Sequence, residues 1–212
     1  MIARPRRNRL TPFGEIEATP YRGTLMANRG DLHGDDGSVV RDWKLKRWIS
    51  CVLHDPGGSR VVFDTPGTYT PLFALDEAVA MAAGHRPCAS CRRDDYRAFR
   101  SAWMRGVIGS EITVPSASAI DDELHRWRMS PTAGLATLQF LRDLPVGVFF
   151  RLPTDRRRAW LWTGRSMREW SHAGYADDQS PSSGRMVVIT PWPMIAVMRS
   201  GYVPRSFGHR AS

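Results

Sequence analysis

The stretch that decides the fold is AGHRPCASC, residues 83–91. It contains a Cys-x-x-Cys turn made by Cys88 and Cys91. Two thiols at this spacing bind one tetrahedral metal ion from a single turn, which is half of a structural zinc site. Cys51 lies upstream in an apolar run and can supply a third thiolate. The sequence therefore predicts a zinc-stabilised module built around this turn.

A structural zinc site needs four ligands, and the chain has only 3 cysteines. His54 is the first candidate for the fourth, because Cys51 and His54 form a Cys-x-x-His pair. In a regular strand these two side chains point to opposite faces, so His54 can bind only if the chain turns before it. The turn residues DPG at 55–57 favour this. His33 and His85 are the alternatives.

Composition limits the class of protein. A chain of 212 residues with 42% hydrophobic residues can bury a sizeable core. No run approaches the roughly 18–20 apolar residues that span a bilayer, and no apolar segment follows the basic N-terminus, so we expect neither a membrane span nor a secretory signal. An odd number of cysteines argues against a disulfide framework and predicts a reducing, cytoplasmic location.

The charge balance points to the class of partner. The formal net charge is +9 and the isoelectric point is about 10.3. A surplus of this sign predicts a polyanionic partner, most often nucleic acid. Most of the basic residues are arginines, which pair with phosphate in a fork and stack on bases.

Local patterns predict an α+β fold: a small zinc-stabilised α+β module followed by a β-rich region with a few short helices. We expect a hairpin of two strands, 48–53 and 60–63, around the turn at 55–58. Helices are expected at 75–83 and from Asp94 onward, and the latter places Tyr96, Phe99 and Trp103 on one face, which is typical of a core face.

The second half of the chain shows mainly strand patterns, with one predicted helix before them and one after. A third helix is predicted near 119–129, then strands at 148–152, 159–163 and 186–190, and a short helix at 193–199 that begins with proline. The predicted organisation is a basic flexible arm at 1–20, the zinc module at 21–107, a helical connector at 108–145, a β-rich region at 146–204 and a tail at 205–212. The β-rich region carries no common nucleotide-binding or hydrolase motif.

The stretch AVAMAAGHRPCASCR, residues 78–92, resembles the second half of the Ada-type zinc domain, a bacterial module that senses methylated DNA phosphates. His85 stands where that family usually has an aromatic residue. The resemblance covers about residues 45–100. It implies a small α+β fold, a zinc held by four cysteines, contact with the DNA backbone, and a methyl-accepting cysteine at the position of Cys51.

Two departures from that family bear on function. The chain lacks a second upstream cysteine, and Val52 stands where the family has arginine. Replacing one thiolate with a neutral imidazole lowers the nucleophilicity of the remaining thiolates. We therefore predict a structural metal, no methyl transfer to Cys51, and a nucleic-acid-binding protein that contacts phosphate. The predicted phosphate contacts are Arg86, Arg92, Arg93 and Arg97.

The alternative function is a metal-dependent enzyme that acts on nucleic acid or nucleotide. Two clusters of titratable side chains could carry its chemistry. One is His33 with Asp31, Asp35 and Asp36, which could form an oxygen-rich site for Mg²⁺ or Mn²⁺. The other is Asp121 with Glu123 and His125. A third hypothesis is a binding module with an aromatic pocket formed by Trp160, Trp162, Trp170, Tyr175 and Trp192.

Overall fold

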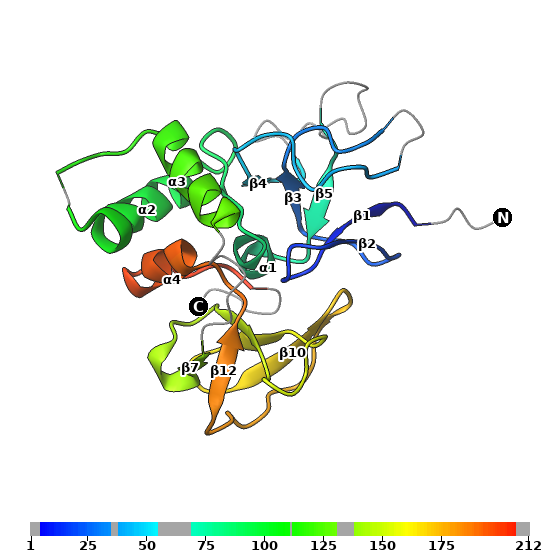
Figure 1. The fold of residues 1–212 in the computed structure, drawn as a ribbon, viewed down its shortest axis with the longest axis vertical. Helices are drawn as coiled ribbons and strands as arrows, with labels where there is room; N and C mark the ends of the chain where they lie inside the picture. The colour runs from blue at the N-terminus through cyan, green and yellow to red at the C-terminus, as the bar shows by residue number, and fades with distance from the viewer. Residues whose placement is uncertain (1–4, 35–37, 55–68, 111, 131–137, 207–212) are drawn as a thin grey trace.

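The computed structural model describes residues 5–34, 38–54, 69–110, 112–130 and 138–206. Within these ranges the chain forms two six-stranded sheets, with helices packed between and beside them, so the predicted α+β class is confirmed. Figure 1 shows the first sheet above, the second below and the helices α2, α3 and α4 together at one side. The short helix α1 lies between the two sheets.

The first sheet carries the Cys-x-x-Cys turn of Cys88 and Cys91. Its strands are β1 (Arg7–Leu10), β2 (Ile16–Ala18), β3 (Leu25–Asn28), β4 (Ile49–Cys51), β5 (Leu72–Ala74) and β6 (Arg86–Pro87). They are arranged in the order β2-β1-β5-β3-β4-β6. The pairs β1–β5 and β4–β6 are parallel, and the other pairs are antiparallel. The parallel pairing of β4 with β6 places the segment before Cys51 beside the segment before Cys88.

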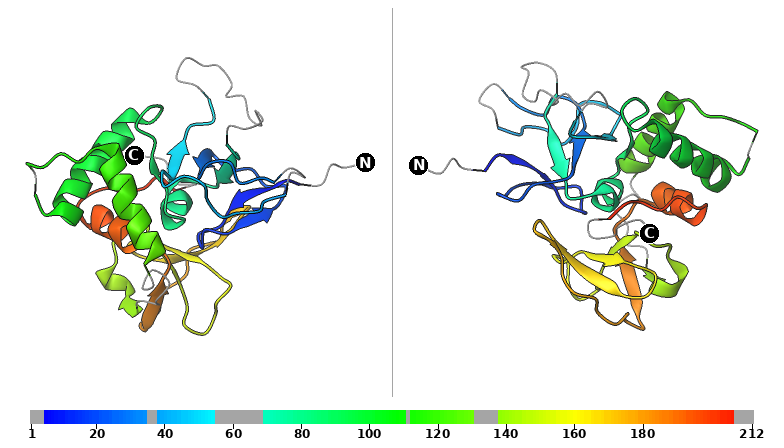
Figure 2. Two further views of the ribbon diagram at one scale, coloured as in Figure 1. Left: turned by 45° about the horizontal axis from the view of Figure 1, so that its top comes forward. Right: turned by 180° about the vertical axis from the view of Figure 1, so that it is seen from behind.

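The N-terminal segment is part of this sheet and not a flexible arm. Although residues 1–20 are basic and interrupted by prolines, β1 and β2 pair with each other, and β1 also pairs with β5. Leu10 is completely buried. The prediction of an arm is therefore wrong for residues 7–18, and these strands form the edge of the sheet farthest from α2 and α3 (Figures 1 and 2).

Helix α1 (Glu77–Ala82) is buried along its whole length. It begins at Asp76, whose carboxylate accepts a hydrogen bond of 2.8 Å from the Val79 amide, as expected of an N-cap. Gly84 has a φ of +87°, a conformation that favours glycine, and it ends the helix. The predicted helix at 75–83 is thus confirmed apart from its ends.

The remaining helices pack on one side of α1. They are α2 (Arg93–Trp103), continued by one π-helical turn (Met104–Ile108), α3 (Ala117–Met129) and α4 (Trp192–Arg199). Tyr96, Phe99 and Trp103 of α2 are all buried, as the sequence predicted. They join α3, α4 and the second sheet in one core cluster.

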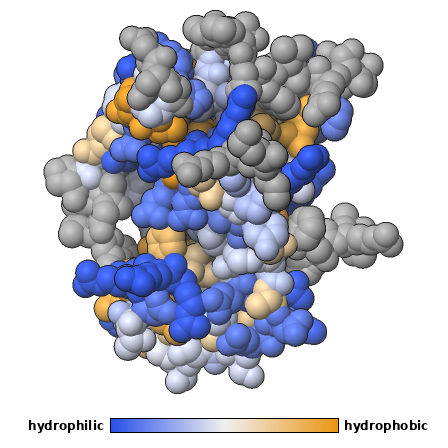
Figure 3. Space-filling model, turned by 90° about the vertical axis from the view of Figure 1, so that its right-hand side faces the viewer, coloured by the Kyte–Doolittle hydropathy of each residue, from blue (hydrophilic) through white to orange (hydrophobic). Residues whose placement is uncertain are grey.

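The second sheet is antiparallel throughout, in the order β11-β10-β9-β8-β12-β7. Its strands are β7 (Leu138–Phe140), β8 (Phe149–Arg151), β9 (Trp160–Trp162), β10 (Met167–Ser171), β11 (Gly174–Tyr175) and β12 (Arg185–Val188). A short 3-10 turn (Leu141–Asp143) follows β7. On the face of the molecule in Figure 3, hydrophilic side chains cover most of the surface and apolar patches are small and separate.

The buried core does not follow the predicted division of the chain. That division has a zinc module, a helical connector and a separate β-rich region. Strand β7 lies within the predicted helical connector but belongs to the second sheet. Phe149 and Leu161 of the second sheet pack in one buried cluster with α1 and the first sheet. The two halves therefore share a continuous interior.

Two further predictions are limited by the described residues. The expected strand at 60–63 lies outside them, and within them β4 pairs with β3 and β6. None of the helices in the described ranges has the length and apolar character needed to cross a membrane.

The buried position of Leu10 gives a test of the N-terminal strands. We expect Leu10→Ala to lower the free energy of unfolding by about 2–5 kcal/mol, because it removes packing from a site with no exposure. Denaturant unfolding followed by tryptophan fluorescence measures the change. The exposed Glu15→Ala in the same segment is the control, expected within about 0.5 kcal/mol of wild type. Equal stability of both variants would show that the segment does not pack as described.

Candidate metal centre

The three cysteines of the chain meet at one point. Cys51 is the last residue of β4, and the Cys88 amide donates a 3.0 Å hydrogen bond to the Ser50 carbonyl, which extends the parallel pairing of β4 with β6. The turn that follows brings Cys91 back to the same place. The sulfur atoms of all three lie within 4.8 Å of one another, and none is in a disulfide.

The geometry and electrostatics of this group suit a metal ion. Metal–sulfur bonds of about 2.3 Å in a tetrahedron place sulfur atoms about 3.8 Å apart, which is compatible with the 4.8 Å limit within which these three lie. Hydrogen bonds from the thiols of Cys51 and Cys91, and from the amides of Ser90 and Cys91, lower the pKa of Cys88 despite its burial. The same shared protons, with burial, raise the pKa of Cys51. The three cysteines could therefore hold a metal ion.

The predicted fourth ligand is not part of this group. His54 is exposed and lies outside the set of ligand atoms that share the 4.8 Å limit. His85 is completely buried, with Nδ1 donating to the Ala80 carbonyl at 3.2 Å and Nε2 accepting from Arg29 at 3.2 Å. His33 Nδ1 bonds to the Thr70 hydroxyl at 3.0 Å. His85 is thus fully used elsewhere, and His54 as a ligand stays a prediction.

Arg92, directly after the cysteine turn, is an internal anchor. It is 6% exposed and pairs with Glu77 at 2.7 Å and with Asp95 at 2.8 Å. It also donates to the Ser50 hydroxyl at 2.8 Å. Burial alone would lower the pKa of Arg92, but the Glu77 carboxylate beside it raises that pKa above its ordinary value. This guanidinium ties α1, β4 and α2 to the cysteine turn.

Arg86 anchors the other side of the turn. It is 2% exposed and forms a two-point ion pair with Asp121 of α3, at 2.8 and 2.7 Å, while also donating to the Pro87 carbonyl at 2.9 Å. Burial raises the pKa of Asp121, and the hydrogen bonds from Arg86 oppose that shift. The pair fixes α3 against the turn.

The predicted phosphate contacts therefore divide into two kinds. Arg86 and Arg92 are buried and ion-paired, so neither presents its guanidinium to a polyanion at the surface; the prediction is corrected for these two. Arg93 is exposed, and Arg97 is 70% exposed with a 3.3 Å pair to Asp94. These two remain available, and their role stays a prediction.

The two titratable groups considered for catalysis do not assemble within the described residues. Asp121 pairs with Arg86, and His125 packs edge-on against Trp43 with ring centroids 4.6 Å apart. Glu123 pairs with Arg126 at 2.6 Å. In the other group Asp31 pairs with Lys44 at 3.3 Å, and Asp35 and Asp36 lie outside the described residues. Of the five aromatic residues considered for a binding pocket, Trp160 and Trp162 are buried in the core and do not line an open pocket together.

A cleft of about 530 Å³ opens beside the cysteine turn. Ile49, Cys88, Ala89 and Ser90 line one side of it, and Ala117, Ser118, Asp121 and Asp122 of α3 line the other. Leu45, Lys46, Arg47 and Arg86 complete it. Asp121 pairs with Arg86, and Asp122 pairs with Lys46 at 2.9 Å. Arg47 is the cation of the lining that forms no ion pair within 4.0 Å among the described residues, and its charge acts on Asp121 from a greater distance.

Sequence reasoning missed this cleft and the ion pair at its floor. Arg86 and Asp121 are 35 positions apart, and no periodicity connects them. The only signal in the sequence is the position of Arg86 between Gly84 and the Cys-x-x-Cys turn. Two turns so close together leave little room for a solvated side chain.

Comparison of the chain with known protein families, with curated proteins and with solved structures finds no match.

The ion pair gives a prediction about stability. Arg86→Ala leaves a buried carboxylate on Asp121 without its partner, which is expected to cost about 3–5 kcal/mol of unfolding free energy. The double variant Arg86→Met with Asp121→Leu removes both charges and should recover most of that loss. Arg126→Ala, which breaks an exposed pair on the same helix, should leave stability nearly unchanged. An Arg86→Ala variant as stable as Arg126→Ala would contradict the anchoring role.

The cysteine group gives a prediction about metal. Cys88→Ser removes the central thiol, so the variant should lose bound metal and melt at a lower temperature, because metal binding and folding are coupled in such modules. Elemental analysis of protein purified without chelators measures the first effect and calorimetry the second. Ser90→Ala in the same turn is the control and should keep its metal. A Cys88→Ser variant that keeps its metal and melts like wild type would reject the site.

Proposed function

We propose that this chain is a nucleic-acid-binding protein whose metal is a structural zinc ion. The choice of zinc rests on the ligands: three thiols in one compact group are soft donors, which zinc prefers in tetrahedral protein sites. His54 is the proposed fourth ligand. Zinc would then close a ring between β4 and the turn after β6.

The surroundings of the three cysteines support a structural role for the proposed metal. Cys51 and Cys88 are each 8% exposed, and the two arginines that flank the turn are both committed to internal ion pairs. Such a centre holds elements together and offers few groups for chemistry. This agrees with the expectation that Cys51 does not accept methyl groups.

The cleft beside the cysteine turn is the observation that carries the nucleic-acid proposal. Arg47 is exposed and forms no ion pair within 4.0 Å among the described residues, although its charge acts on Asp121 of the same cleft. The first turn of α3 lines the opposite wall, and its amides, together with the helix dipole, favour an anion. A phosphate there would meet Arg47 from one side and the helix end from the other.

The charge of the whole chain supports the same proposal. A net charge of +9 attracts a polyanion over a distance of several ångströms and raises the rate of encounter. The exposed Arg93 and Arg97 lie on α2, the helix that follows the cysteine turn, and can add phosphate contacts. Such contacts position a nucleic acid without reading its sequence.

Duplex DNA binding measured by fluorescence anisotropy over a salt series tests this proposal. Binding should weaken as salt rises, with a slope of about −0.9 per phosphate contact. Arg47→Glu should weaken binding and reduce the slope by about one, because it removes one contact.

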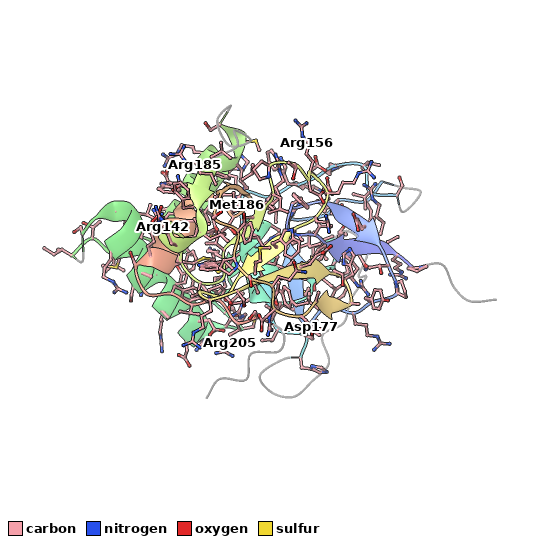
Figure 4. The ribbon with its side chains drawn as sticks, turned by 90° about the horizontal axis from the view of Figure 1, so that it is seen from below. Arg142, Arg156, Asp177, Arg185, Met186 and Arg205 are labelled. Atoms are coloured by element: carbon pink, nitrogen blue, oxygen red, sulfur yellow. The ribbon has the colours of Figure 1, made fainter. Side chains whose placement is uncertain are left out.

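The matched control is Arg156→Glu, which makes the same charge change, from +9 to +7, on an exposed side chain that points away from the body of the protein (Figure 4). Equal effects of the two variants would place the interface elsewhere. No binding by wild type at low salt would reject the proposed function.

A further inference from the structure

A second cavity, of about 400 Å³, lies around Trp48, the residue before β4. Its lining is mostly aromatic and apolar, with two arginines and one carboxylate. The lining residues include Phe13, Arg29, Trp43, Trp48, Trp127 and Arg128. This volume falls within the range of pockets that bind small molecules.

Two guanidinium groups of this cavity lie over one indole ring. The Cζ atom of Arg29 is 4.0 Å from the centroid of the Trp48 ring, and that of Arg128 is 4.2 Å from it. Cation–π contact at these distances orients both groups and holds them in place. The cavity therefore presents two positive charges in a fixed arrangement.

Neither guanidinium has a carboxylate within ion-pair distance among the described residues, although the charge of Asp42 acts on Arg29 and that of Asp121 on Arg128. Asp42 lines the same cavity. Arg29 is 2% exposed, and its positive charge meets only neutral acceptors: His85 and the carbonyls of Gly14 and Ala83.

The guanidinium of Arg128 is likewise hydrogen-bonded, within the described part of the chain, only to neutral carbonyl groups. It donates to the carbonyls of Gly84 and Lys46, at 3.0 and 2.7 Å, but its Nε is buried without any acceptor. Burial lowers the pKa of Arg128 to about 10, and burial with the nearby Arg128 charge lowers that of Arg29 to about 9. A negatively charged group in the cavity would stabilise both cations.

A purely structural role explains only part of this arrangement. The carbonyls of Ala83 and Gly84 follow the last turn of α1, where cations stabilise a helix end. Arg29 donates to the Ala83 carbonyl and Arg128 to the Gly84 carbonyl, so both guanidinium groups share this role. It does not account for the buried Arg128 Nε without an acceptor or for the aromatic walls of the cavity.

We propose that this cavity binds a small planar organic anion, an aromatic or heteroaromatic ring that carries one phosphate or carboxylate group. The anionic group would lie against Arg29 and Arg128, and the ring would pack on Trp127, Trp43 and Phe13. The site goes beyond nucleic-acid binding at the cleft, because it is carried by different residues.

Titration calorimetry of the full chain with two probes tests the proposal. The probes are adenosine 5′-monophosphate and 1-naphthoate, and adenosine and 1-naphthylmethanol are their neutral counterparts. We expect 1:1 binding of at least one anionic probe with a dissociation constant below about 1 mM, and at least about tenfold weaker binding of its neutral counterpart. The probe that binds identifies the class, nucleotide or aromatic carboxylate. The proposal is overturned if neither anion binds, or if the neutral compound binds as well.

Variants then locate the site. Arg128→Gln should weaken binding of the anion at least about tenfold, because it removes a charge-assisted hydrogen bond. Arg126→Gln, two residues earlier on α3 and outside the cavity, is the matched control and should bind like wild type.

Met129→Trp provides a second variant if Arg128→Gln does not fold. Met129 is 50% exposed at the cavity edge, so a larger side chain there narrows the cavity at little cost to folding. Arg47→Glu should leave probe binding unchanged, which separates this site from the cleft. Binding that is unaffected by both Arg128→Gln and Met129→Trp would contradict the assignment.

Discussion

The structure depends on the meeting of three thiols between the parallel strands β4 and β6. Strand β6 contributes only two residues to the sheet, too few to hold its own register. The hydrogen bond from Cys88 to Ser50 and the sulfur group at the end of the pair fix it in place. Two short segments that are far apart in the sequence are thereby joined where neither has a large apolar surface. The sulfur cluster is small, with Met26 and Ile49 as its other buried members.

Buried ion pairs connect the cysteine turn to the rest of the fold. Arg86 connects the turn to α3, and Arg92 connects it to α1 and α2. Glu77 extends the second connection, since its carboxylate also accepts hydrogen bonds from the Tyr202 hydroxyl and the Arg205 amide. The C-terminal segment is thus held against α1 by hydrogen bonds to Glu77, and burial beside Glu77 raises the pKa of Tyr202. Removing one member of such a network leaves the others with unpaired buried charges, so these ion pairs are expected to be costly to break.

Much of the fold was predictable from local patterns. The Cys-x-x-Cys turn, the buried face of α2 and the strands β8, β9 and β12 each show a signal within a few residues. The strands β1 and β2 do not, because a basic, proline-interrupted segment becomes a strand only through its pairing with β5. For the same reason the roles of Arg86 and Arg92 could not be predicted: their partners Asp121 and Glu77 are 35 and 15 positions away. Of the candidate site, the three cysteines came from spacing, whereas the cleft and the Trp48 cavity arise from side chains that only the tertiary structure brings together.

The central claim is that Cys51, Cys88 and Cys91 share one zinc ion. X-ray absorption at the zinc edge, on the full chain purified without chelators, tests it most directly. We expect one zinc per chain with three sulfur atoms at about 2.3 Å and one nitrogen at about 2.0 Å, the values for thiolate and imidazole ligands. A spectrum without sulfur in the first coordination shell, or a protein without zinc, would contradict it.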